Sequence, residues 1–234
     1  MSQPENTYIL QYKIRSGTNM SLDYSFVDSK DGITLLQDKT LANLDWTKLE
    51  HEKCTNCTLN AAEHPNCPAA ENLALLINDC EQTISFETVE LEVVSKQRTI
   101  SATTSAQKAL SSLVGLVMAT SECPHTQFFR PMAQFHLPLS NQEETAFRAI
   151  STYLLTQFFK NQQGQDVSYD LSGLMDIYNN LHTVNVHMNK RIKNAIESDT
   201  AINAVVILDI LAITLPNYLE EELDKLRPYF SKLL

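Results

Sequence analysis

The sequence predicts an α+β protein, in which a small and mostly antiparallel sheet precedes a helical bundle. Over roughly the first hundred residues apolar and polar side chains alternate, which is the period of a strand with one buried face. From residue 103 onward apolar side chains recur every three or four residues, the spacing of an amphipathic helix. We expect residues 1–102 to form the β-rich part and residues 103–234 the bundle, packed together as one unit.

The β-rich part contains four or five segments with strand character. The first two alternate on either side of the 16–19 turn and so predict a hairpin, because a short polar turn between alternating segments joins antiparallel strands. Asp31 and Gly32 supply the turn before a short third strand. The segments expected to form strands are 8–15, 22–26, 33–36, 84–95 and 97–101.

Helix signals begin at Pro68, since proline is favoured at the first helical position, where its missing N–H would be unpaired. Ser140 and Glu143 have the spacing of a capping box that opens a further helix. Pro216 is expected to restart the chain as a last helix, which Pro228 ends or bends. The other segments expected to be helical are 40–50, 103–120, 171–195 and 201–215.

The 171–195 segment carries the clearest helical pattern and predicts a long apolar seam. Asn185 interrupts this seam. We interpret it as a hydrogen-bonded or register-fixing core amide, with a role in a binding site as the alternative. Lys190, Arg191 and Lys193 are expected to lie on a solvated helix face.

The composition argues against several classes of protein. A formal net charge of −10 disfavours nucleic-acid binding, which needs Lys and Arg to neutralise phosphates. The longest apolar stretch, Ala204–Leu215, is shorter than the roughly 20 residues of a membrane-spanning helix. The N-terminal sequence lacks the pattern of a secretory signal. We therefore expect a cytoplasmic protein whose five cysteines are ligands or free thiols, not disulfides.

Four of the five cysteines have the spacing of a metal site. Cys54 and Cys57 form a CxxC pair, and Cys67 follows just before a predicted helix. Cys123 lies in a loop after the first long helix of the bundle. Four thiolates from two loops satisfy the tetrahedral preference of zinc. We expect Cys54, Cys57, Cys67 and Cys123 to bind a structural zinc ion that joins the sheet to the bundle.

Three alternatives to this zinc site stay open. The same four cysteines could hold an iron–sulfur cluster, because a proline follows two of them, as in ferredoxin-type motifs. His64 or His125 could replace one cysteine, since imidazole also suits zinc. The cysteines could also be independent free thiols, which is our interpretation of Cys80, whose context is that of a buried thiol.

No catalytic motif occurs in the sequence, and we assign no catalytic or cofactor-binding residue. The GxSxG, HExxH, P-loop and GxGxxG patterns are absent. An enzyme stays an alternative through the 125–136 loop, where His125, Arg130 and His136 could line a pocket.

The cysteine and proline motifs resemble those of an uncharacterised bacterial domain family. The resemblance covers nearly the whole chain and implies a bacterial cytoplasmic protein, without a particular activity. It rests on Cys54-x2-Cys57, Cys67-Pro68, Cys123-Pro124-His125 and the segment 130–138. We expect a non-catalytic binding or regulatory protein that contacts another protein or a second copy of itself, with zinc serving the fold.

Overall fold

A computed structural model describes residues 8–17, 21–30, 32–36, 44–79, 86–195 and 199–233. In these residues a five-stranded antiparallel sheet is followed mainly by helices, which confirms the predicted α+β class. The strands are β1 (Tyr8–Ser16), β2 (Ser21–Ser29), β3 (Gly32–Leu35), β4 (Thr88–Ser95) and β5 (Thr99–Ser105). The helices are η1 (Asp45–Thr47), α1 (Pro68–Asp79), α2 (Ala106–Ala119), η2 (Gln127–Phe129), α3 (Arg130–Gln134), α4 (Gln142–Gln162), α5 (Ser172–Ala195) and α6 (Asp199–Phe230).

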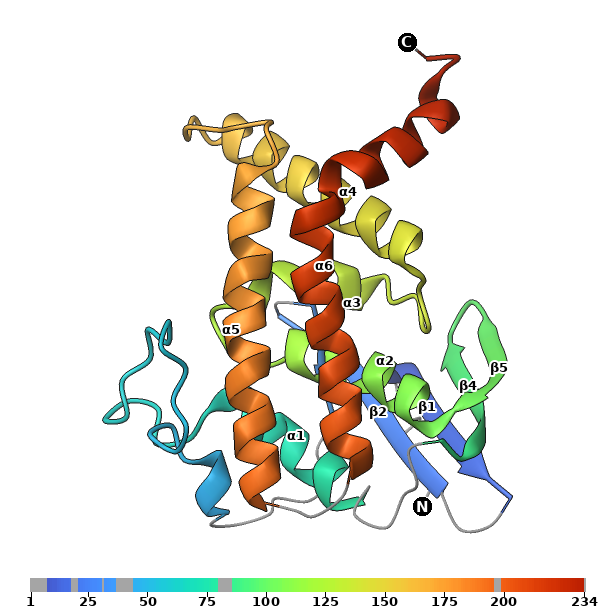
Figure 1. Ribbon diagram of the computed structural model, residues 1–234, viewed down its shortest axis with the longest axis vertical. Coiled ribbons are helices and arrows are strands. Elements are labelled where there is room, and N and C mark those ends of the chain that lie inside the picture. The colour runs from blue at the N-terminus through green and yellow to red at the C-terminus, as the bar shows by residue number, and fades with distance from the viewer. Residues whose placement is uncertain are drawn as a thin grey trace, which may run out of the picture.

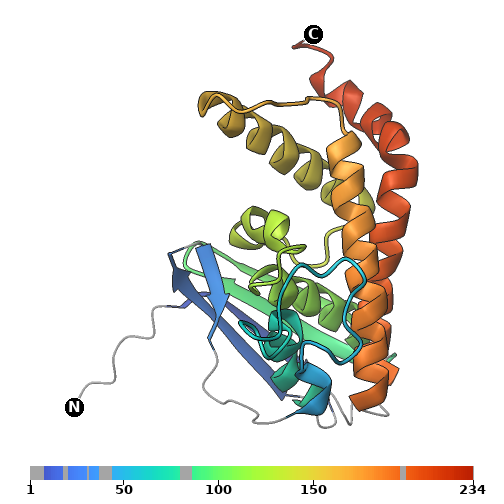
Figure 2. The same ribbon diagram turned by 90° about the vertical axis from the view of Figure 1, so that its left-hand side faces the viewer.

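The elements form three layers (Figure 2). The sheet, in the order β3-β2-β1-β4-β5, is the first layer, and α1 and α2 cover one of its faces. The long helices α5 and α6 run side by side; α6 packs on the outer side of α2, and α5 contacts η1. α4 crosses this pair at the end that lies away from the sheet (Figure 1). The sheet and the long helices therefore enclose the shorter helices between them.

The buried face of the sheet follows the predicted alternation. The central strand β1 buries Leu10, Tyr12 and Ile14, while the side chains between them are less buried. The register places Tyr12 opposite Tyr24 of β2 and Val93 of β4. These residues belong to one apolar core that also includes residues of α1, α2, α5 and α6. β5 continues to residue 105, three residues beyond the expected end of the β-rich part.

The prediction of two separate helices at the C-terminal end was wrong. α6 is one helix from Asp199 to Phe230 and continues through Pro216 and Pro228. It changes direction in its C-terminal part (Figure 1). A bend is expected there, because a proline inside a helix lacks the N–H that would form a backbone hydrogen bond. None of the helices in the described ranges combines the length and hydropathy that crossing a membrane requires.

Two further predictions about helix ends need correction. The residue that caps α4 is Asn141, not Ser140: its side chain accepts from the N–H of Glu144, and the Glu144 carboxylate accepts from the N–H of Asn141. The capping box is therefore present, shifted by one residue. Within the 40–50 segment, the described residues form only the short helix η1, and residues 40–43 lie outside the described ranges.

Arg191 is buried, which contradicts the expected solvated face. Its side chain is 1% exposed, and its guanidinium donates to three backbone carbonyls. Nη1 lies 2.8 Å from the oxygen of Trp46 and 2.7 Å from that of Lys48, and Nη2 lies 2.9 Å from that of Leu49. Among the described residues no carboxylate forms an ion pair with it. Arg191 thus fixes α5 to the segment at η1 by hydrogen bonds to the backbone.

Replacing Arg191 with methionine should lower the free energy of unfolding by about 3 kcal/mol or more. The variant keeps the length of the side chain but leaves the buried carbonyls of Trp46 and Leu49 without a donor, at about 1–3 kcal/mol for each group, while the carbonyl of Lys48 still accepts from the N–H of His51. Urea unfolding followed by circular dichroism measures the effect. The matched control is Arg227→Met at an exposed residue near Asp224, which should change stability by less than about 0.5 kcal/mol. Equal losses in the two variants would contradict the anchoring role.

Candidate functional site

The 54–67 loop is closed at its base by backbone hydrogen bonds between the residues that precede it and those that end it. The N–H of Leu49 donates to the oxygen of Pro65 at 2.9 Å, and the N–H of Cys67 donates to that of Thr47 at 2.7 Å. Inside the loop, the N–H of Cys57 donates to the oxygen of Cys54 at 3.0 Å and closes a turn. The CxxC pair and Cys67 are therefore carried by one constrained loop, and α1 begins directly after it.

The loop that contains Cys123 meets the 54–67 loop. The ring Nε2 of His125 lies 2.7 Å from the oxygen of Asn56, which stands between the two cysteines of the CxxC pair. A carbonyl oxygen can only accept, so Nε2 of His125 is the donor. Cys67 and Cys123 are both buried in the central core, and Cys54 and Cys57 pack against that core. The structure thus brings residue 123 to the other three predicted ligands.

We call Cys54, Cys57, Cys67 and Cys123 the cysteine cluster, and all four are free thiols. Burial is the main cause that raises the pKa of Cys54 to about 12; the charges of the other three cysteines contribute to this rise, and the charge of Arg191 opposes it. Burial also raises the pKa of Cys123, to about 11. Within the described ranges, no three His, Cys, Asp or Glu side chains are placed so that they could hold a metal ion as they stand. The thiols are neighbours without forming a coordination sphere.

The three side chains of the 125–136 loop do not converge on one pocket. His125 contacts the CxxC turn, and Arg130 donates to the oxygen of Ser121 and pairs with Glu122. His136 alone of the three lines the large cavity described next. The enzyme alternative required these three side chains to converge on one pocket, and they do not do so.

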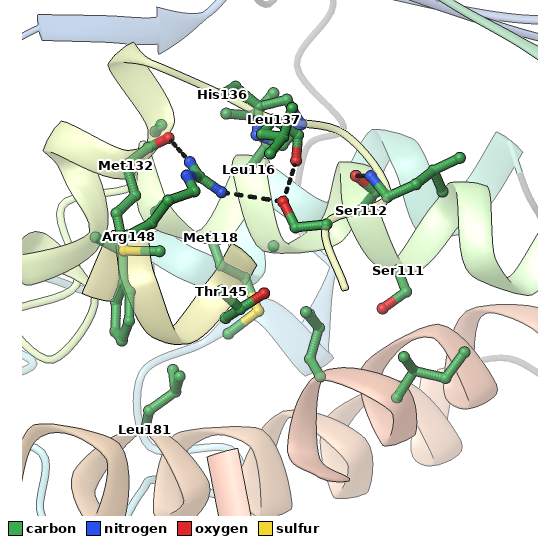
Figure 3. Close-up of a pocket in the computed structure, with 18 of the residues that line it drawn as sticks. Ser111, Ser112, Leu116, Met118, Met132, His136, Leu137, Thr145, Arg148 and Leu181 are labelled. Atoms are coloured by element: carbon green, nitrogen blue, oxygen red, sulfur yellow. Dashed lines mark hydrogen bonds between the residues drawn. The ribbon is translucent and has the colours of Figure 1, made fainter. Parts of the chain in front are cut away.

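A cavity of about 620 Å³ lies between α2, the α3–α4 connection, α5 and α6 (Figure 3). Most of its wall is apolar, and Leu116, Met118 and Leu181 are examples. Arg148 enters from α4 and donates to the oxygens of Met132 and Phe135 and to Oγ of Ser140. A volume of this size is typical of sites that take a small molecule.

One side of the cavity is joined to the sheet by hydrogen bonds. The hydroxyl of Tyr12 in β1 lies 2.8 Å from Oγ of Ser112 and 2.5 Å from Nε2 of His136. Burial lowers the pKa of His136 to about 3, and the nearby charge of Arg148 lowers it too, so the ring is neutral at physiological pH. Burial raises the pKa of Tyr12, which keeps its proton. These residues form a neutral hydrogen-bonded group next to the charge of Arg148.

Sequence reasoning did not single out Tyr12 or Arg148. Tyr12 has the pattern of an ordinary core residue of a strand. Glu144 stands one helical turn before Arg148, which is the spacing of a common surface ion pair, so no local signal marks Arg148. Asn185 was noticed as a break in the seam, and it lines the cavity.

The sequence profile of a family described as a domain of unknown function, DUF6901, matches residues 9–231. The chain belongs to this family. The match confirms the expectation of an uncharacterised domain family. No curated protein and no solved structure matches the chain significantly. Membership of the DUF6901 family implies no particular activity.

Replacing His136 with glutamine should flatten the acid side of the stability profile. The folded pKa of His136 lies below the ordinary value of 6.5, so the folded protein binds fewer protons than the unfolded chain. Stability is then fully present above about pH 6.5 and falls as the pH drops toward about pH 3. Between about pH 7 and about pH 5 the wild type should lose about 1–2 kcal/mol more than the variant, measured by urea unfolding. The same loss in both proteins would show that His136 is not held neutral.

Proposed function

We propose that this DUF6901 protein is a non-catalytic binding protein, in which a zinc ion held by Cys54, Cys57, Cys67 and Cys123 joins the sheet to the helices. The observation that carries the proposal is the meeting of two loops distant in sequence, with four cysteines at their junction. The zinc ion serves the fold, and the protein acts by contact with another protein. We propose the cytoplasm as its compartment, because a reducing environment keeps thiols available as ligands.

The chemistry of the cysteine cluster supports zinc. Four thiolates complete a tetrahedral shell, and a Zn–S bond of about 2.3 Å requires sulfur atoms about 3.8 Å apart. The side chains of the four cysteines therefore have to rotate so that their sulfur atoms point toward one zinc ion. Cys67 directly precedes α1, and the positive end of a helix dipole stabilises a thiolate there. Coordination also removes the cost of burying these thiols in their charged form.

Arg191 supports the same site through its charge. A zinc ion with four thiolates carries two units of excess negative charge, which is costly to bury without cations or N–H donors close by. Arg191 is a buried cation that has no carboxylate partner among the described residues. It binds the backbone just before the 54–67 loop, and its charge acts on Cys54. The positive charge of the guanidinium would offset the negative charge of a zinc–thiolate centre.

The surface of α4 supports a role in protein contacts. Phe147, Leu155, Phe158 and Phe159 are between 46% and 52% exposed. Their spacing places them along one broad side of the helix. Exposed apolar side chains that gather on one side of a helix are typical of an interaction surface. We propose that this side of α4 binds a second copy of the chain, through a helix-to-helix contact.

The zinc site is tested by elemental analysis of the purified protein together with single cysteine variants. We expect about one zinc ion per chain in the wild type. Cys57→Ser and Cys67→Ser should lose the metal and melt at a lower temperature, because the free energy of metal binding contributes to folding. Cys80→Ser changes the cysteine outside the cluster and should keep the metal content of the wild type.

Three results would change the conclusion on the metal. A brown protein that contains iron and acid-labile sulfide would replace zinc with the iron–sulfur alternative. A melting curve that a strong chelator does not shift would contradict a structural metal of either kind. Zinc retained in Cys67→Ser but lost in His64→Ala or His125→Ala would move one ligand from a cysteine to a histidine.

The contact through α4 is tested by sedimentation velocity over a range of concentrations. The wild type should sediment faster as its concentration rises, and the double variant Leu155→Ser, Phe159→Ser should remain monomeric, since it removes two central apolar side chains from the surface. Phe86→Ser changes an exposed phenylalanine outside α4 and should behave as the wild type does. A wild type that stays monomeric at all concentrations would contradict the contact between copies.

A further inference from the structure

The cavity has the opposite charge to the rest of the protein. Among the residues that the structure describes, its lining includes two cationic residues, Lys108 and Arg148, and no Asp or Glu side chain. The chain as a whole carries a formal net charge of −10. A concave, largely apolar site that gathers positive charge in an acidic protein favours an anionic ligand, because the low-dielectric walls strengthen the attraction.

Arg148 is held in place but keeps its charge available. Three backbone or hydroxyl oxygens fix the guanidinium, and among the described residues no carboxylate forms an ion pair with it. Arg148 and Tyr178 line the same cavity. Burial raises the pKa of the Tyr178 hydroxyl, and the charge of Arg148 opposes this rise, as expected for neighbouring groups. A carboxylate at this end would meet a guanidinium and a phenol, both of which donate hydrogen bonds.

Asn185 provides the second polar point of the cavity. It is 1% exposed, and neither Nδ2 nor Oδ1 has a hydrogen-bond partner in the described part of the chain. An unsatisfied buried amide costs about 1–3 kcal/mol for each group, so a core that used leucine here would be more stable. Asn185 therefore does not fix the register through a hydrogen bond. Its amide lines the cavity and can form hydrogen bonds with a polar group of a bound ligand.

The two polar residues of α5 that line the cavity, Tyr178 and Asn185, lie at a defined distance from each other. Tyr178 and Asn185 are seven residues apart on one side of the helix, with Leu181 between them. A rise of 1.5 Å per residue puts them about 10 Å apart. Leu181 and the α6 residues Ile207 and Leu208 provide apolar wall in the same cavity. The site thus offers an anion-binding end, an apolar wall and an amide.

We propose that this cavity binds a small amphipathic carboxylate that carries a second polar group about 10 Å from its carboxylate. The carboxylate pairs with Arg148, the hydrocarbon body packs on Leu181 and Leu208, and the second polar group bonds the amide of Asn185. The cavity lining and the cysteine cluster share no residue. If the protein binds no zinc, the ligand proposal is unaffected. If the cavity binds no carboxylate, the zinc proposal is unaffected.

Calorimetric titration of the full-length protein with three related probes tests the proposal. 8-Hydroxyoctanoate carries both polar groups, octanoate lacks the hydroxyl, and 1,8-octanediol lacks the charge. The wild type should bind 8-hydroxyoctanoate most tightly and with one site per chain. Arg148→Gln should weaken both acids about tenfold or more and leave the diol within about twofold, since a hydrogen bond to a charged group is lost only for the acids.

Asn185→Leu gives an independent test, which matters because Arg148 also holds the α3–α4 connection and its variant could fold poorly. This variant should weaken 8-hydroxyoctanoate to the affinity of octanoate and leave octanoate itself unchanged. In the absence of a ligand it should melt at a higher temperature than the wild type, because it removes an unsatisfied amide from the core. A purely structural Asn185 would give a lower melting temperature.

Asn189→Leu is the matched control, since Asn189 lies one helical turn further along α5. Its buried oxygen has no partner among the described residues, and it is not part of the cavity lining that these residues form. It should bind all three probes as the wild type does. The proposal is overturned if the wild type binds none of the probes at millimolar concentration. It is also overturned if Asn185→Leu and Asn189→Leu bind 8-hydroxyoctanoate equally well.

Discussion

The arrangement of this protein depends on one buried arginine. Arg191 reaches from α5 to three carbonyls of the segment at η1, which have no partner within a regular helix or sheet. Without this donor the carbonyls of Trp46 and Leu49 would be buried and unsatisfied, or the segment would have to move to the surface. Since the 54–67 loop follows directly, Arg191 helps to place the first three cysteines relative to α5, together with the hydrogen bonds that join Asn56 to Asn180 and Glu52 to His187.

The junction of the two cysteine loops follows from this anchor. Once the 54–67 loop is fixed against α5, the turn after α2 meets it through His125 and Asn56, and Cys123 enters the same core. The junction joins a loop of the β-rich part to the first long helix of the bundle. A metal there would stabilise a contact that is already built from hydrogen bonds and apolar packing.

If the cavity binds the proposed carboxylate, stability and binding compete in the same bundle. α5 presents apolar residues to α6 along most of its length, yet it carries Asn185 where α2, α5 and α6 surround an open volume. An unsatisfied amide and a cation without a carboxylate partner both lower the stability of a ligand-free protein. Natural proteins retain such groups where a ligand uses them. The hydrogen bonds of Tyr12, Ser112 and His136 connect this region to the sheet, so the cavity has one rigid side.

The sequence by itself determined the strands and most helices, because alternation and helical spacing are local patterns. Only the tertiary structure decided that Arg191 is buried, that α6 continues through Pro216, and that Arg148 and Asn185 share a cavity. A charged residue on a helix has the same local sequence pattern whether its face meets water or backbone carbonyls. Its environment is set by residues more than a hundred positions away, and neighbouring residues in the sequence do not encode that contact.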